Sequence, residues 1–214
     1  MSSMFKGDTP FYQVLTKLFD VILLNALFVI CCIPVVTIGS SMTALYYMTM
    51  KMIKDEEPGI IKGFFRAFKE NFKQSFPMTL LLLLMAVILG GDLYILGNSE
   101  SPYNTILFGG GVVLLMIVAA IASYAFPMLA RFENTVKNTL TNAAKLALAY
   151  LPYTAIFLLV NVGPIVWFIL SPETFSHVFK IWICIGIGGG AYLNSIFLLR
   201  IFEKLTPDEE QTVE

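Results

Sequence analysis

The chain has 214 residues, of which 57% are hydrophobic and only 14% are charged, against about 25% charged residues in soluble domains. Its net charge of −1 gives no reason to expect nucleic acid or an acidic substrate as a partner. The composition therefore argues against an ordinary soluble domain and for a lipid bilayer as the surroundings of the chain.

Five long stretches contain no charged side chain: 21–50, 74–91, 101–130, 146–172 and 181–199. A bilayer core requires about 20 consecutive apolar residues in a helix, and lipid leaves no partner for the backbone except its own hydrogen bonds. The sequence predicts an all-α, multi-pass transmembrane bundle of five to six membrane helices, folded as a single integral membrane domain over 1–214.

The distribution of Lys and Arg predicts the orientation of this bundle. Basic residues gather in 51–75, in 131–145 and after the last apolar stretch, whereas 92–103 has none and 171–180 has only Lys180. Short cytoplasmic loops are enriched in Lys and Arg. We therefore expect the first three segments inside and the two short loops outside.

Residues 18–54, which follow an N-terminal segment over 1–17, are too long for one straight crossing. Pro34 interrupts the helical hydrogen bonds, Gly39 adds a flexible point, and either of the next two serines could cap a new helix. Two interpretations stay open. A broken helical hairpin crosses twice and keeps the N-terminus inside, whereas one kinked helix crosses once.

Residues 58–127 are predicted to form an elbow helix, lying in the cytoplasmic headgroup layer, and two spans that begin at Pro77. Aromatic and cationic residues recur along the elbow at steps of three or four, the period of a helix face. The aromatic face is Ile61, Phe65, Phe68, Phe72 and Phe76, and the cationic face is Lys62, Arg66, Lys69 and Lys73. Such a helix rests on the membrane surface or offers a docking surface to a partner.

The same order of elements returns over 131–200, with an elbow near 131–148 and two spans that begin at Pro152. The elbow has a weaker apolar face, formed by Phe132, Val136, Leu140, Ala144 and Ala147. An acidic tail over 201–214 then ends the chain. The repetition raises the hypothesis of a parallel duplication.

Three asparagines, Asn25, Asn161 and Asn194, lie within apolar stretches. Polar side chains inside a membrane are costly and often functional. They could line a cavity for a polar solute, or each could bond across to a neighbouring helix. In the last span, Gly186 and Gly190 have the spacing of small residues that allows two helices to approach closely.

No arrangement of residues predicts catalysis. The chain has one histidine, His177, and three cysteines that all lie in apolar stretches, where a thiol is typically a small packing residue. No metal site, cofactor site or activated nucleophile follows from this sequence, so we do not expect an enzyme.

Three segments carry a resemblance to a known family: NALFVICCIPVVTIGSSMTALYY at 25–47, FPMLARFENTVKNTLTNAAKLAL at 126–148 and AYLNSIFLLRIFEK at 191–204. Together they resemble the YesL family of bacterial membrane proteins, which has no assigned biochemical activity. Its members often occur beside ATP-driven carbohydrate importers. The resemblance therefore implies a multi-pass protein of the bacterial cytoplasmic membrane with permease subunits of such an importer as candidate partners.

The motif positions that this chain shares with the family are candidates for conformational or contact roles: Pro34, Thr37, Gly39, Thr43, Ala44 and Tyr46 in the first segment, and Arg131, Phe132, Glu133 and Asn134 in the second. A pair between Arg131 and Glu70 would lock the two elbows together. The resulting expectation is a non-catalytic accessory or interaction subunit in carbohydrate uptake. The alternative is a small solute transporter in its own right, and the sequence leaves the oligomeric state open.

Overall fold

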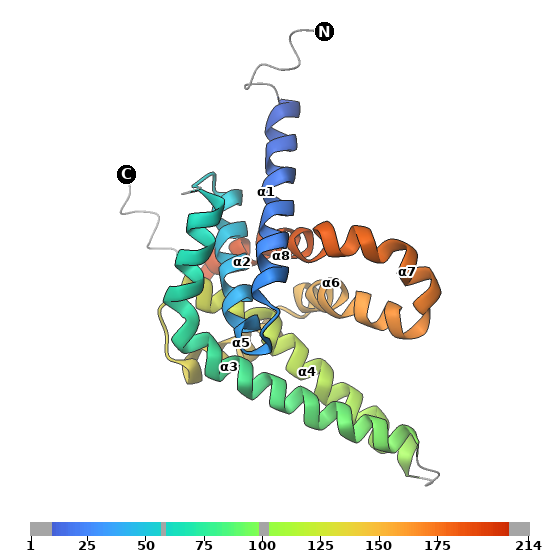
Figure 1. The fold of residues 1–214 in the computed structure, drawn as a ribbon. Helices are drawn as coiled ribbons and strands as arrows, with labels where there is room; N and C mark the ends of the chain where they lie inside the picture. The colour runs from blue at the N-terminus through green and yellow to red at the C-terminus, as the bar shows by residue number, and fades with distance from the viewer. Residues whose placement is uncertain (1–9, 57–58, 99–102, 206–214) are drawn as a thin grey trace.

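A computed structural model describes residues 10–56, 59–98 and 103–205, so most of the N-terminal segment and of the acidic tail lies outside the described residues. This part of the chain contains helices and turns but no strand, which confirms the all-α prediction. The helices, shown in Figure 1, are α1 (Pro10–Cys31), α2 (Ile38–Ile53), α3 (Ile60–Gly97), α4 (Asn104–Arg131), α5 (Val136–Ala149), α6 (Leu151–Leu170), α7 (Pro172–Ile181) and α8 (Ile187–Leu205).

Five helical segments are long and apolar enough to cross a membrane, in agreement with a multi-pass protein. They are most of α1, the whole of α3, α4 and α6, and a continuous segment, Pro172–Leu205, that joins α7 to α8. A five-residue π-helical segment, Trp182–Gly186, connects α7 and α8 without a break.

Helices α1 and α2 form a hairpin through a short 3₁₀ turn, Val35–Thr37, and α2 returns beside α1 in the opposite direction (Figure 1). An ion pair between Lys17 Nζ and Asp55 Oδ1, 2.7 Å apart, joins the open end of this hairpin. At 16 residues, α2 is about 24 Å long. Helix α1 begins earlier than the sequence predicted, because its polar first turns continue the same helix.

The predicted serine cap of α2 is wrong. Helix α2 begins at Ile38, so both Ser40 and Ser41 lie inside its first turn. Thr37 occupies the cap position without a side-chain cap bond, and Ser41 Oγ instead donates to Thr37 O at 2.9 Å.

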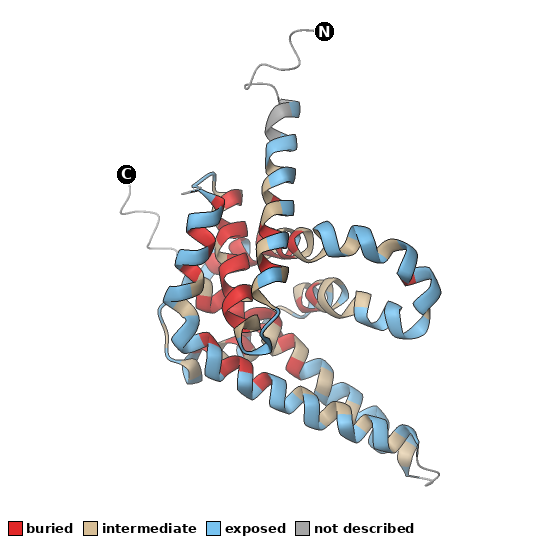
Figure 2. Ribbon diagram, viewed as in Figure 1, coloured by how far each residue is buried: buried red, intermediate tan, exposed pale blue. Residues whose placement is uncertain are grey.

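Helix α2 is buried on all sides by α1, α3, α4 and α8, as Figure 2 shows. Its buried residues are Gly39, Ser40, Ser41, Thr43, Ala44, Leu45, Tyr46, Met48, Thr49, Met50 and Met52. Small and hydroxyl-bearing residues let neighbouring helices approach closely. This short helix is therefore the centre of the fold.

The C-terminus of α2 is closed by its own backbone. Glu56 N donates to Lys51 O at 3.0 Å, and Asp55 N donates to Met52 O at 3.4 Å. Asp55 has a φ of 54°, the left-handed conformation that this Schellman-type ending requires. The last carbonyl groups of α2 therefore have partners without help from a side chain.

The first predicted elbow is not a separate helix. Helix α3 runs for 38 residues with Pro77 inside it, and its ribbon changes direction partway along (Figure 1). Before the bend, the face towards α2 carries Ile60, Phe64 and Ala67. The predicted aromatic face remains largely uncovered, with Phe65 40% and Phe76 38% exposed.

The second elbow, α5, is a separate helix. Its first turn is capped by Thr135, whose Oγ1 accepts from Asn138 N at 3.3 Å. Its buried face is formed by Thr139, Ala143, Leu146 and Ala147, so it is rotated from the predicted face and includes a threonine. Pro152 lies in the first turn of α6, where proline needs no helical partner.

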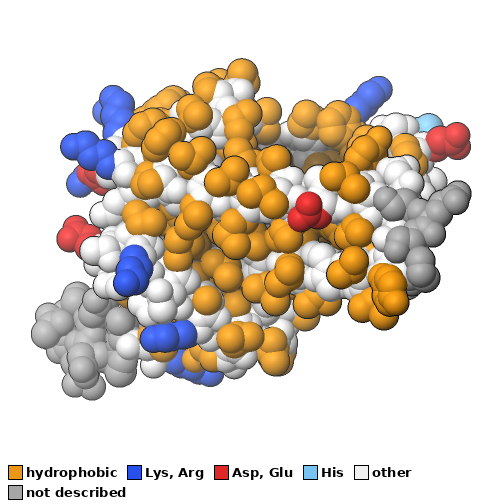
Figure 3. Space-filling model, turned by 90° about the horizontal axis from the view of Figure 1, so that it is seen from below, with side chains coloured by type: hydrophobic (Ala, Val, Ile, Leu, Met, Phe, Trp, Pro, Cys, Tyr) orange, Lys and Arg blue, Asp and Glu red, His pale blue; other side chains and the backbone are white. Residues whose placement is uncertain are grey.

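Two apolar hairpins diverge from this core. One consists of α4 and the second half of α3, the other of α6, α7 and α8 (Figure 1). Their outer ends are mainly exposed in Figure 2. Figure 3 shows an apolar surface between the ends of the molecule, with most of the visible Lys and Arg side chains gathered at one end.

The orientation can be tested by thiol labelling in intact cells. In a variant without the three native cysteines, a new cysteine at Ser176, exposed on α7, should react with an impermeant reagent. A new cysteine at Lys62, exposed on α3, should react only after permeabilisation, because basic segments stay cytoplasmic. The opposite pattern would invert the predicted orientation.

Candidate functional site

The turn between α1 and α2 is held by Thr37. Its hydroxyl lies 2.5 Å from Cys31 O and 2.6 Å from Pro34 O, and its backbone N–H donates to Pro34 O at 3.0 Å. These contacts satisfy carbonyl groups that the end of a helix leaves without partners. Pro34 has extended backbone angles, so it ends α1 and directs the chain into the turn.

Gly39 provides close packing rather than flexibility, so the prediction of a flexible point is wrong. It lies in the first turn of α2, where an added Cβ would be 1.7 Å from Thr79 Oγ1 and 2.8 Å from the Phe126 ring. Beside it, Ser40 Oγ and Ser75 Oγ are 2.6 Å apart. The absence of a side chain at Gly39 is what allows α2 to meet α3 and α4.

Two of the three asparagines meet in a network that joins four helices. Asn194 Nδ2 on α8 donates to Asn161 Oδ1 on α6 at 3.2 Å and to the hydroxyl of Tyr46 on α2 at 3.3 Å. Asn161 Nδ2 donates to Ser123 Oγ on α4 at 3.0 Å. We call Tyr46, Ser123, Asn161 and Asn194 the amide cluster.

The amide cluster keeps one hydrogen-bond acceptor without a partner. Asn194 Oδ1 is buried and has no partner among the residues that the structure describes, and Asn194 itself is only 1% exposed. An unpaired buried acceptor costs about 1–3 kcal/mol. The helices that form the amide cluster therefore leave one of its buried hydrogen-bond acceptors unsatisfied.

A half-enclosed pocket of about 250 Å³ adjoins this cluster. Tyr46 and Asn161 supply polar groups to its wall, and Gly186 and Gly190 lie on the α8 side. The pocket shares Phe28, Pro164, Ile165, Trp182 and Ile187 with a larger apolar groove of about 570 Å³ between α1, α6 and α7.

Asn25 is separate from the cluster and bonds across to the last span. Its Nδ2 donates to Ile183 O at 2.7 Å, and its Oδ1 accepts from Gly188 N at 2.7 Å. These two groups lie at and just after the π-helical segment, where the ordinary helical bonding pattern is interrupted. Asn25 therefore anchors α1 to the irregular part of this span.

The glycines of the last span have different neighbours. An added Cβ at Gly190 would be 2.9 Å from Val160 on α6, which fits the predicted helix contact. At Gly186 it would be 2.4 Å from the ring of Trp182, so this glycine packs under its own helix instead. Gly188, which the spacing argument missed, lies against α1, with an added Cβ 3.0 Å from Val21 O.

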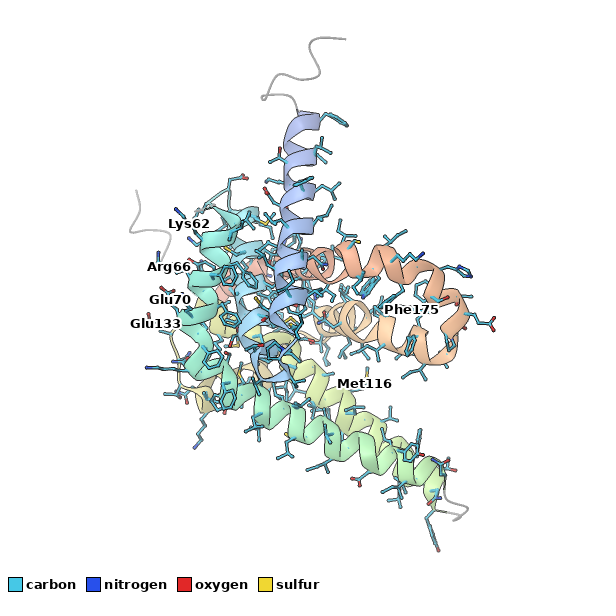
Figure 4. The ribbon with its side chains drawn as sticks, viewed as in Figure 1. Lys62, Arg66, Glu70, Met116, Glu133 and Phe175 are labelled. Carbon is cyan, nitrogen blue, oxygen red and sulfur yellow. The ribbon has the colours of Figure 1, made fainter. Side chains whose placement is uncertain are left out.

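The predicted pair between Arg131 and Glu70 is replaced by another. Glu70 Oε1 accepts from Arg66 Nε on the same helix at 2.9 Å, because a residue four positions away is nearer than a second helix. In Figure 4, Arg66, Glu70 and Glu133 lie on the same side of the molecule. Arg131 instead lines a small cavity with Lys51, Lys54 and Glu56.

The other motif residues of this region lie in the short connection from α4 to α5. Glu133 is exposed, whereas Phe132 and Asn134 are half-buried. They are not brought together with the amide cluster. The motif residues therefore belong to two places, the first half of α2 with the turn before it, and the end of α4 with the connection that follows it.

The amide cluster offers neutral donors and acceptors rather than a charged or nucleophilic group. This chemistry suits hydrogen bonding to hydroxyl groups and gives no means of proton transfer at neutral pH. Ser123 was missed in the sequence because a serine inside an apolar helix is common, and Tyr46 was predicted only as a family motif position, without its place among the asparagines. The useful signal was that Tyr46 lies within a segment with small polar residues on every helical face.

Comparison with known proteins gives one match. Residues 21–93 match the model of a family described as "Protein of unknown function, DUF624". This region runs from α1 through most of α3 and includes the contact between Gly39 and Thr79. No curated protein and no solved structure matches the chain.

The close packing at Gly39 predicts a large effect of one added methyl group. Gly39→Ala should lower the free energy of unfolding by about 1–3 kcal/mol, since an overpacked core must shift or strain. Thermal unfolding of the purified protein in detergent measures this. Gly90→Ala is the matched control, because nothing lies within 4 Å of an added Cβ there, and it should be at least as stable as the native chain. Equal loss in both variants would contradict the packing role.

The Asn25 bridge predicts a loosened last span in Asn25→Ala. Loss of two interhelical bonds should lower the free energy of unfolding by about 1 kcal/mol or more. It should also raise the labelling rate of Cys184, which lies in the π-helical segment. Asn98→Ala is the control, because the Asn98 Nδ2 bond that the described residues show goes to Tyr94 O in its own helix. An unchanged Cys184 rate would show that Asn25 does not hold this segment.

Proposed function

We propose that this protein is a non-catalytic component of the bacterial cytoplasmic membrane that acts as an accessory or interaction subunit in carbohydrate uptake. The observation that carries the proposal is the divergence of its two apolar hairpins from a shared core (Figure 1). Carbohydrate uptake enters through the resemblance to the YesL family, whose members often occur beside carbohydrate importers.

Each hairpin leaves helix faces free in the bilayer. In the first hairpin, α3 and α4 pack on each other. Of the helices in the other hairpin, α6 is the one that α4 contacts substantially. Large apolar side chains on the outer part of the first hairpin are well exposed, among them Val87, Tyr94, Ile106 and Val113. Lipid or the helices of another membrane protein can cover such faces equally well in energetic terms, because lipid tails are as apolar as leucine.

Small residues on the first hairpin favour a helical partner over lipid alone. Nothing lies within 4 Å of an added Cβ at Gly90, Gly91, Gly109 or Gly110. Glycine lowers the helix propensity by about 1 kcal/mol, and its usual benefit in a membrane is the close approach of another helix. None of the described helices makes that approach, and a partner helix would account for these glycines.

A second function, transport of a small polar solute, is favoured by the amide cluster. Asn161 and Tyr46 face a pocket of about 250 Å³ at the membrane-buried part of the fold, and Asn194 Oδ1 is an unused acceptor. Hydroxyl groups of a sugar would match these neutral groups. Against this function, no carboxylate lines the pocket to couple movement to an ion gradient.

Affinity purification from membranes tests the leading proposal. The tagged chain, extracted in mild detergent, should recover permease subunits of a carbohydrate importer. Gly110→Leu should reduce that recovery several-fold, because the new side chain blocks close helix approach without a clash inside this chain. Val113→Leu, which enlarges a side chain that is already exposed, serves as the matched control.

The outcomes separate the two functions. Recovery that is unaffected by Gly110→Leu contradicts the hairpin as the contact surface. Failure to recover any permease subunit, combined with sugar uptake by the purified chain in liposomes, favours the transporter. In that case Asn161→Leu should abolish uptake while Asn98→Leu leaves it unchanged.

A further inference from the structure

The pocket beside the amide cluster and the apolar groove next to it form one continuous space with two different ends. Their volumes are about 250 Å³ and about 570 Å³, and five side chains line both. Together they fall within the roughly 300–1,000 Å³ that is typical of small-molecule sites. We call the two spaces together the composite cavity.

The polar end of the composite cavity keeps hydrogen-bonding capacity that the amide cluster does not use. Asn161 Nδ2 carries two donors, and one bonds to Ser123 Oγ. The Oδ1 atom of Asn161 and the hydroxyl oxygen of Tyr46 each accept one bond from Asn194 Nδ2. Even with a bond between Tyr46 and Asn161 themselves, one donor and one lone pair remain on this pair of side chains. A hydroxyl group, which both donates and accepts, matches them.

The composite cavity is neutral as well as polar at this end. None of the described residues that line it is charged. A phosphate, an ionised carboxylate or an ammonium group would lose its water there without meeting an opposite charge, which is costly. The matching group is therefore an uncharged hydroxyl.

The apolar end of the composite cavity is open to the surroundings of the helices. Its walls come from α1, α6 and the segment Pro172–Leu205, all of which are long and apolar enough to cross a membrane. Ile33, Ile165 and Phe168 line the groove and are exposed. Phe175, which also lines it, lies between α7 and α6 in Figure 4. A ligand therefore enters from the bilayer, where it must be a lipid.

We propose that the composite cavity binds a neutral single-chain lipid alcohol. Its hydroxyl group bonds to Asn161 and Tyr46, and its hydrocarbon chain lies in the apolar groove. A free sugar would satisfy the same two side chains but would leave the groove unfilled. The site is independent of the accessory function proposed above, because it lies on the other hairpin from Gly90, Gly91, Gly109 and Gly110.

Fluorescence quenching by brominated lipids tests the proposal. The chain has two tryptophans, and Trp182 lines both parts of the composite cavity. Trp167→Phe therefore leaves one reporter at the site. This variant is reconstituted in phosphatidylcholine vesicles and titrated with oleyl alcohol that has been brominated across its double bond, since bromine quenches tryptophan on contact. Quenching should saturate.

Two other brominated chains test the headgroup. One is the hydrocarbon without the hydroxyl group, and the other is oleic acid at a mildly alkaline pH, where its carboxyl group is ionised. Each should require a roughly tenfold higher concentration for the same quenching, because it lacks the hydrogen bonds or brings an unpaired charge.

Variants in the Trp167→Phe background localise the effect. Asn161→Leu should remove the preference for the alcohol over the hydrocarbon, whereas Asn98→Leu, at an exposed position of α3, should retain it. If Asn161→Leu does not fold, Ile165→Phe narrows the composite cavity from its exposed side and should weaken binding several-fold. Ile169→Phe is its matched control, exposed on the same helix but outside both spaces.

Each contrary outcome has a defined meaning. Equal quenching by the hydrocarbon and the alcohol would overturn recognition of the hydroxyl group. Equal quenching by the ionised acid would overturn the neutral site, and unchanged quenching in Ile165→Phe would remove the groove from it. Displacement of the brominated alcohol by maltose would replace the lipid by a soluble sugar.

Discussion

The fold depends on the burial of α2 among four neighbouring helices, although this helix is too short to be a conventional membrane span. Inside a bilayer the hydrophobic effect does not drive helices together, because lipid is as apolar as their side chains. Close van der Waals contact and hydrogen bonds must do so instead. Gly39 and the serines beside it supply that contact, since the backbone of α2 approaches Thr79 on α3 more closely than any side chain at this position would allow.

One helix also connects the close contact at Gly39 with the amide cluster. Gly39, Tyr46 and Lys54 lie along α2 and the residue that ends it, so about 22 Å of rigid helix separates the packed end from the basic end. Tyr46 in the middle carries the hydroxyl of the amide cluster. Thr49 Oγ1, 2.7 Å from Ser195 Oγ on α8, fixes the same two helices relative to each other. Both sites therefore lie along a single helix, and four neighbouring helices hold that helix in place.

The apolar stretches predicted the helical architecture well, because their length and composition follow from the energetics of lipid. The boundaries and connections between helices were harder to predict. Pro77 looked like a boundary, yet α3 continues through it, as membrane helices can when neighbouring groups satisfy the freed backbone.

Prediction of the candidate site was limited for a similar reason. An asparagine in an apolar stretch indicates a hydrogen bond, but not which helix supplies the partner. Asn194 bonds to Asn161, whereas Asn25 bonds to the backbone of the π-helical segment. No residue pattern in the sequence predicted that segment. Gly186 and Gly188 differ by two residues and face different helical elements, because residues two positions apart do not lie on the same side of a helix.

Recognition at the membrane surface and recognition deep in the bilayer follow different physical rules. At the headgroup level, water screens exposed pairs such as Arg66 with Glu70, so specificity there needs a cavity that partly encloses the charge. Deep in the bilayer, charges are too costly, and recognition must use shape, small residues and neutral amides. The diverging hairpins and the amide cluster meet the second condition.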